Sequence, residues 1–156
     1  MLRQDGSKLY RRDDKELLLI EPWGKNSLRI RATQRHEFIP DDNSALIAPE
    51  ETDAQITIDG KSATITNGKI TCEVTASGLL RFTNQDGKIL LEEYQRIRDM
   101  FGGTVKFASA LEIQSRTFQP KAGMDNYKLI ARFEPNEGEK IYGMGQYQQD
   151  VLDVKG

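Results

Sequence analysis

The sequence predicts an all-β fold, an antiparallel β-sandwich, and three observations indicate it. Short segments of apolar–polar alternation recur at intervals of roughly ten residues, separated by turn-forming residues. Strand patterns do not alternate with helix patterns as they do in βαβ units, which argues against a parallel sheet. At 156 residues, with 37% hydrophobic and 29% charged residues, the chain has the size and composition of a single globular domain over residues 1–156.

The first third of the chain predicts three extended segments and a long loop. Residues 8–12 and 15–21 form two short extended segments, and the turn-forming run Pro22-Trp23-Gly24-Lys25-Asn26 interrupts them. Residues 34–53 have no sustained period, so we expect a loop there. Between these lies a strand of period two, with Leu28, Ile30 and Ala32 on one face and Arg29, Arg31 and Thr33 on the other.

From residue 54 onward the strand signals become regular. Strands are predicted over residues 54–59, 63–66, 70–74 and 80–82, with tight turns at Asp59-Gly60, Asn67-Gly68 and Asn84-Gln85-Asp86-Gly87. The apolar residues between 90 and 97 fit helical spacing as well as a strand. We favour a strand, because a hairpin turn comes directly before this segment.

The last part of the chain predicts a loop followed by three more strands. Residues 99–110 contain Gly102-Gly103 and indicate a loop or a bulged edge. A strand is expected from Leu111 to near Pro120, and residues 127–133 show the most regular alternation of the chain. After a turn at residues 135–138, a final strand over residues 140–142 is expected to run into Gly143-Met144-Gly145.

The run E-K-I-Y-G-M-G-Q, from Glu139 to Gln146, resembles the E-x-x-Y-G-x-G-[EQ] signature that closes the N-terminal β-sandwich of glycoside hydrolase family 31. That family contains α-glucosidases and α-xylosidases, and the continuation to Gly156 is more similar to α-xylosidase-type members. The resemblance covers most of the chain loosely and is specific over residues 139–156. It implies a galactose-mutarotase-like sandwich and a fragment whose catalytic (β/α)8 barrel lies beyond residue 156.

The same resemblance implies the reaction of the parent enzyme. It would be a retaining α-glycosidase that hydrolyses terminal α-linked xylose or glucose from oligosaccharides, without a metal or other cofactor. Its two catalytic aspartates would lie on the barrel, and this chain contains no W-x-D-M-N/S-E-like nucleophile motif, so we assign no catalytic residue here. The chain would pack against the barrel, contribute the loop after Gly145 to the substrate pocket, and be inactive alone.

Three residues of that loop, Gln146, Tyr147 and Gln148, are the candidate substrate-binding residues. Amide and phenol groups both donate hydrogen bonds to sugar hydroxyls and accept them, and the preceding glycines free the backbone to aim these groups outward. Packing against the barrel is the alternative role. A nucleotide site is not expected, because the dinucleotide fingerprint requires a glycine where the chain has Gln148.

Three other residues offer chemistry that the pattern does not favour. Trp23 could stack on a sugar ring, but its place in a turn between strands favours packing. His36 is the only histidine, so neither a two-histidine metal site nor the histidine–glutamate pair typical of free-standing mutarotases is expected. Cys72 alternates with apolar neighbours, which predicts a buried core residue, and a single cysteine forms no internal disulfide.

Charge and hydropathy exclude two classes of partner. With 22 basic and 24 acidic residues the net charge is −2, which provides no electrostatic case for binding nucleic acid or an anionic membrane. The sequence has no apolar stretch of about 18 residues that could span a bilayer. The start of the chain lacks the apolar core of a signal peptide, so we expect a soluble protein, cytoplasmic or periplasmic.

An independent carbohydrate-binding β-sandwich module is the competing interpretation. It predicts affinity of the isolated chain for an oligosaccharide, with loss of binding on Trp23→Ala or Tyr147→Ala. A structural spacer, the third class, predicts neither binding nor activity. Exposed apolar side chains concentrated on one side would favour the fragment, because a sandwich separated from its barrel exposes the interface.

Overall fold

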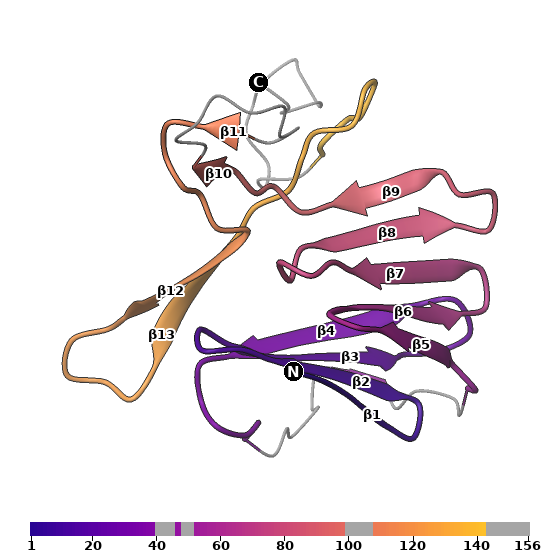
Figure 1. Ribbon diagram of the computed structural model, residues 1–156, viewed down its shortest axis with the longest axis horizontal. Coiled ribbons are helices and arrows are strands. Elements are labelled where there is room, and N and C mark those ends of the chain that lie inside the picture. Colours follow the sequence, from indigo (N-terminus) through magenta and orange to yellow (C-terminus); the bar gives the residue numbers. More distant parts are fainter. Residues whose placement is uncertain (40–45, 48–51, 99–107, 143–156) are drawn as a thin grey trace.

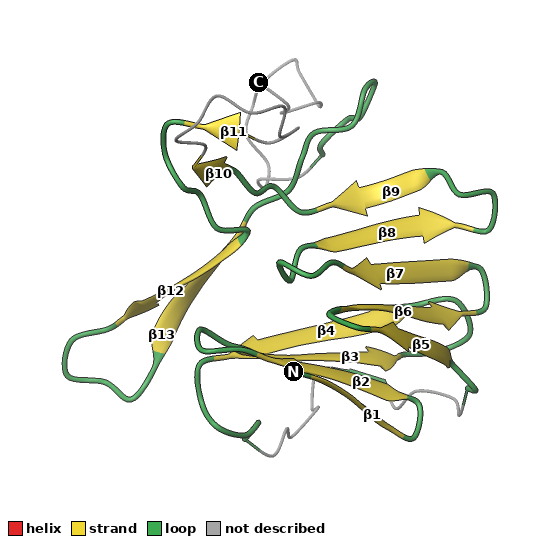
Figure 2. Cartoon of the chain, in the orientation of Figure 1, coloured by secondary structure: helices red, strands yellow, loops and turns green. Residues whose placement is uncertain are grey.

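The computed structural model describes residues 1–39, 46–47, 52–98 and 108–142, and every regular element in these ranges is a β-strand (Figure 2). Two antiparallel sheets form the body, each with its strands in chain order. The first sheet consists of β1 (Leu2–Asp5), β2 (Lys8–Arg12), β3 (Leu17–Pro22) and β4 (Leu28–Thr33). The second consists of β5 (Gln55–Asp59), β6 (Ser62–Asn67), β7 (Ile70–Val74), β8 (Leu80–Asn84) and β9 (Ile89–Glu92). The all-β class is therefore confirmed.

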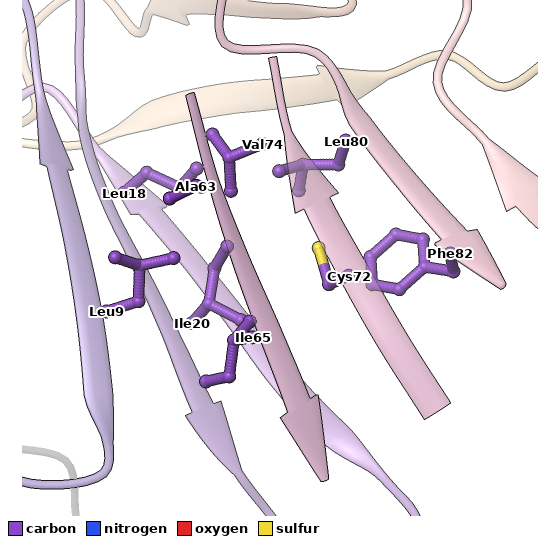
Figure 3. Close-up of a cluster of buried hydrophobic side chains, with 9 residues drawn as sticks. All are labelled: Leu9, Leu18, Ile20, Ala63, Ile65, Cys72, Val74, Leu80 and Phe82. Atoms are coloured by element: carbon purple, nitrogen blue, oxygen red, sulfur yellow. The ribbon is translucent and has the colours of Figure 1, made fainter. Parts of the chain in front are cut away.

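The two sheets face each other across one hydrophobic core, which makes the body a β-sandwich (Figures 1 and 3). β2 and β3 supply three buried side chains and β6, β7 and β8 supply the others. Alternation places every second side chain of a strand on this face, as the period of two predicted. The core cluster consists of Leu9, Leu18, Ile20, Ala63, Ile65, Cys72, Val74, Leu80 and Phe82, and Leu28, Ile30 and Ala32 pack against it.

Two predicted turns meet at one end of the sandwich and tie its sheets together. The Asn67 amide donates to the carbonyl oxygens of Gly24 and Ser27, each at 2.7 Å. Gly68 has a φ of +58°, and a Cβ there would collide with the backbone of Lys25. The turn after β6 therefore requires glycine both for its backbone conformation and for the close approach of the turn after β3.

A smaller C-terminal part continues from the edge of β9 (Figure 1). It contains the two-residue strands β10 (Ile97–Arg98) and β11 (Ala108–Ser109), which pair in parallel, and the antiparallel hairpin of β12 (Arg116–Pro120) and β13 (Tyr127–Ala131). Isolated bridges join Glu93 to Phe133 and Arg96 to Ile113. The Tyr127 hydroxyl hydrogen-bonds to Thr33, so the hairpin also contacts the end of β4.

The structure corrects four expectations. β1 was not predicted, because L-R-Q-D carries no apolar alternation and is mostly exposed. No strand forms over residues 140–142. The last β-bridge toward the C-terminus of the described residues joins Phe133 to Glu93. The strand expected from Leu111 begins only at Arg116. β10 and β11 pair in parallel, although no parallel pairing was expected.

Candidate functional site

The predicted substrate-binding residues Gln146, Tyr147 and Gln148 lie outside the described residues. The structure does describe the segment that leads to them, as far as Tyr142 (Figure 1). It runs along the edge of β9. The backbone N–H of Glu134 donates to the backbone carbonyl oxygen of Glu92 at 2.8 Å, and the side-chain amide of Asn136 donates to the carbonyl oxygen of Leu90 at 3.0 Å. These bonds fix where the chain leaves the sandwich on its way to Gly143.

Several apolar side chains in and around this part of the chain are exposed. Tyr142 is 62% exposed and Leu111 is 71% exposed, although both are large enough to be core residues. β9, β10 and the segment after β13 carry five more: Ile89, Leu90, Ile97, Phe133 and Ile141. Other exposed apolar side chains, among them Met1, Ile47, Ile58 and Met124, lie elsewhere. Several exposed apolar side chains in one part of a chain are typical of a surface that another protein part covers.

A buried ionic cluster joins the C-terminal part to the sandwich, and Arg116 lies at its centre. The Arg116 guanidinium donates to Glu16 and to the carbonyl oxygen of Gly78, each at 2.9 Å, and it contacts both oxygens of Glu93. The side chains of Arg116 and Glu93 are only 6% and 3% exposed. Glu93 also accepts the backbone N–H of Leu80 at 2.9 Å. Three segments, at Glu16, Gly78 and Glu93, therefore meet on the guanidinium of a fourth.

Ion pairs and hydrogen bonds favour the charged forms of the groups in and beside this cluster. Burial by itself lowers the pKa of Arg116, but hydrogen bonds to Glu16 and the charge of Glu93 raise that pKa well above its ordinary value. Burial raises the pKa of Asp13, whereas hydrogen bonds from the Lys15 backbone and from Arg11 lower it, and the net effect is a lowered pKa. A general acid needs a raised carboxyl pKa, so Asp13 is unsuited to that role.

Glu92 and Glu93 are consecutive acidic residues, but their side chains point to opposite faces and do not converge on one bond. Glu92 accepts from Arg81 at 2.7 Å, whereas Glu93 belongs to the Arg116 cluster. Within the described ranges, no group of three or more histidine, cysteine or acidic residues could hold a metal ion. The nearest hollow, of about 530 Å³, lies beside the cluster and is lined by Asp13, Asp14, Glu16, Ser115 and Arg116 among others.

Trp23, His36 and Cys72, the three other candidate residues, each make contacts within the protein. The Arg29 guanidinium lies 4.6 Å from the centre of the Trp23 ring and covers one face of it, which supports packing over sugar stacking. His36 accepts a hydrogen bond from Arg12 at 2.9 Å. Cys72 is fully buried in the core, and burial together with the charge of Glu93 raises the pKa of its thiol. A thiol with a raised pKa is a poor nucleophile, so the buried-core prediction is confirmed.

Comparison with known proteins relates the chain to one family of glycosidases. No family model matches the sequence. A protein described as an uncharacterized family 31 glucosidase ORF2, from Pseudescherichia vulneris, is 45% identical over 151 residues, which cover 93% of this chain. The crystal structure of a GH31 α-xylosidase from a soil metagenome, complexed with xylose, superposes over 100% of this chain with a TM-score of 0.86 and 40% identity. Over nearly its whole length the chain is similar to one region of family 31 glycosidases, as the run from Glu139 to Gln146 predicted.

Both relatives are much longer than the region that they share with this chain. The chain spans 28% of the Pseudescherichia vulneris protein and 24% of the soil-metagenome α-xylosidase. The part of the chain that the structure describes has no helix with the length and apolarity needed to cross a bilayer.

The sequence prediction missed the Arg116 cluster, because its members lie far apart in the sequence and none has a local motif.

Proposed function

We propose that this chain is the non-catalytic N-terminal β-sandwich domain of a retaining α-glycosidase, an α-xylosidase or α-glucosidase that acts on terminal α-linked sugars of oligosaccharides. One observation carries the proposal. Nearly the whole chain aligns with family 31 proteins, yet it spans about a quarter of their length. Most of such a protein, including a catalytic (β/α)8 barrel, would then lie outside this chain.

The surface of the chain supports a packing role. Some of the exposed apolar side chains lie on β9, on β10 and in the segment after β13. A barrel that covers this part of the chain would remove side chains such as Leu111 and Tyr142 from water. The loop after Gly145 would then reach the substrate pocket with Gln146, Tyr147 and Gln148, whose amide and phenol groups suit sugar hydroxyls.

The arrangement of the carboxylates supports a non-catalytic role for the chain. A retaining glycosidase needs two carboxyl groups about 5 Å apart that flank one scissile bond. Glu92 and Glu93 have separate arginine partners, and the pKa of Asp13 is lowered rather than raised. The isolated chain is therefore expected to be inactive.

The proposal is tested with an aryl α-xyloside and an aryl α-glucoside. The purified 156-residue chain should release no aryl alcohol above a buffer blank, whereas the complete protein encoded by the same gene should release it. Turnover by the isolated chain would contradict the non-catalytic role. A gene that ends directly after the codon for Gly156 would contradict the larger enzyme.

The role of the loop is tested in the complete protein. We expect Tyr147→Ala to raise the KM for the aryl α-xyloside by roughly tenfold, since one lost hydrogen bond to a sugar costs about 1 kcal/mol and lost ring packing adds to it. Tyr142→Ala, at the barrel-facing surface, is the matched control and should affect stability more than KM. If Tyr147→Ala, Gln146→Ala and Gln148→Ala all leave the KM unchanged, the loop does not contact the substrate and its proposed role is wrong.

A further inference from the structure

The outer face of the first sheet, on the side away from the core, carries arginines and aromatic rings over buried leucines. The strand register places Arg3, Tyr10, Leu19 and Arg31 in one row across the four strands. Leu19 is buried although its side chain points away from the core cluster, because the side chains around it cover it. Both faces of β3 are thus buried, which is unusual for a sheet whose outer face meets solvent.

These side chains form a groove of about 550 Å³. Leu17 and Leu19 lie at its floor, and the rings of Tyr10 and Phe38 line its walls. The volume is within the range of small-ligand sites, about 300–1,000 Å³. An apolar floor with polar groups at the rim is also the usual composition of such sites.

Three arginines line the groove, and each is held in place. The Arg3 guanidinium lies 4.5 Å from the centre of the Tyr10 ring, and that of Arg31 lies 4.9 Å from the centre of the Phe38 ring. Arg12 donates to the carbonyl oxygen of Arg35 and to His36, each at 2.9 Å. Positioned guanidinium groups lose little conformational entropy when they bind a carboxylate.

The face carries an excess of positive charge. The buried carboxylate of Glu21 is shared, at 3.2 Å from Arg31, 3.7 Å from Arg29 and 3.5 Å from Lys8. Arg3 has an exposed partner in Asp5, and Glu37 is the acidic residue in the groove itself. The cations of the face, Arg3, Lys8, Arg12, Arg29 and Arg31, therefore outnumber its carboxylates, Asp5, Glu21 and Glu37.

We propose that this groove binds an acidic saccharide through a uronic acid residue. The carboxylate of the uronic acid would accept hydrogen bonds from Arg12 and Arg31, and the apolar face of its ring would lie on the leucine floor. The carboxylate of Glu37 and the hydroxyl of Tyr10 would bind the sugar hydroxyls. A simple phosphate suits the site less well, because it leaves the apolar floor uncovered and has no sugar hydroxyls to donate to Glu37.

The inference is independent of the proposed glycosidase domain, because it involves neither the loop after Gly145 nor the exposed apolar side chains of β9 and β10. The test is isothermal titration calorimetry on the 156-residue chain with D-glucuronate, D-glucose and inorganic phosphate. We expect saturable binding of glucuronate that weakens as salt is added, and binding of glucose and phosphate at least tenfold weaker. No measurable glucuronate binding, or phosphate binding of equal strength, would overturn the proposal.

Arg29 provides a matched control for Arg31. Both lie on β4, both stack on an aromatic ring and both contact the same oxygen of Glu21, but only Arg31 lines the groove. Arg31→Gln should weaken glucuronate binding roughly tenfold or more, while Arg29→Gln leaves it unchanged. Arg12→Gln, which leaves the Glu21 cluster intact, should weaken binding similarly. Equal effects of Arg29→Gln and Arg31→Gln, or no effect of Arg12→Gln, would contradict the site.

Discussion

β3 in the sandwich and β13 in the C-terminal part both contain a Leu-Ile pair but lie in different surroundings. Both are short strands rich in leucine and isoleucine, and both pair in antiparallel ladders. All of β3 from Leu17 to Glu21 is buried, because the second sheet packs on one side of it and arginines and rings cover the other. β13 pairs only with β12, and Leu129 is 43% exposed.

The difference shows that the burial of a strand depends on what its two faces meet. A two-stranded hairpin has no second layer to pack against and is marginally stable by itself. The C-terminal part is therefore fixed by a few polar contacts to the sandwich, of which the Arg116 cluster is the most buried. Its exposed apolar side chains can pack against another surface, such as that of the proposed barrel.

The largest effect is expected where the two parts are joined. Arg116→Gln removes the charge that Glu16 and Glu93 share while both carboxylates stay buried. Breaking a buried pair in this way costs about 3–5 kcal/mol, so the free energy of unfolding in urea should fall by about 4 kcal/mol. Arg116→Lys, which keeps the charge but not the planar fork, should recover part of the loss.

The control for this cluster is the less buried pair of Arg96, directly before β10, and Glu134, after β13, whose side chains are 24% and 21% exposed. Arg96→Gln should lower the stability clearly less than Arg116→Gln, because water solvates Glu134 once its partner is removed. Equal decreases in the free energy of unfolding for the two variants would mean that burial does not increase the contribution of the Arg116 cluster to stability.

The next effect compares the two strand environments directly. Leu18 in β3 is fully buried, and Leu129 in β13 is largely exposed. Leu18→Ala should cost about 3 kcal/mol, since it removes core contacts and leaves a cavity. Leu129→Ala should cost less than about 1 kcal/mol in the isolated chain. In the complete protein, a larger cost of Leu129→Ala would indicate that another surface covers the hairpin, and equal costs in the isolated chain would contradict the comparison.

The features of the fold that could be predicted depend on local pattern. The inward row of Ile70, Cys72 and Val74 and the strand of residues 28–33 have a clean period of two, and the structure confirms both. The turns at residues 22–26 and 67–68 were predicted from proline, glycine and asparagine. The order of the two sheets follows because successive antiparallel strands pair with their neighbours in the chain.

The features that could not be predicted depend on contacts between distant residues. Glu16, Glu93 and Arg116 are ordinary charged residues in the sequence, and only the fold brings them together in a buried cluster. The exposure of Leu129 and Phe133 could not be foreseen, because their alternation is the same in a covered strand and in an uncovered one. The arginines on the polar face of β4 were assigned to that face, but their contact with Glu21 required the neighbouring strand.

The smallest effect distinguishes two glycines with a positive φ, one in each part. Gly68 (φ +58°) closely approaches the turn after β3, whereas Gly123 (φ +72°), in the loop between β12 and β13, has open space around it. Gly123→Ala should cost about 1 kcal/mol for its backbone conformation alone. Gly68→Ala should cost about 2 kcal/mol or more, because the added methyl group also forces the two turns apart. Urea unfolding of both variants measures the difference. Equal decreases in the free energy of unfolding would show that the two turns accommodate the added methyl group without loss of stability.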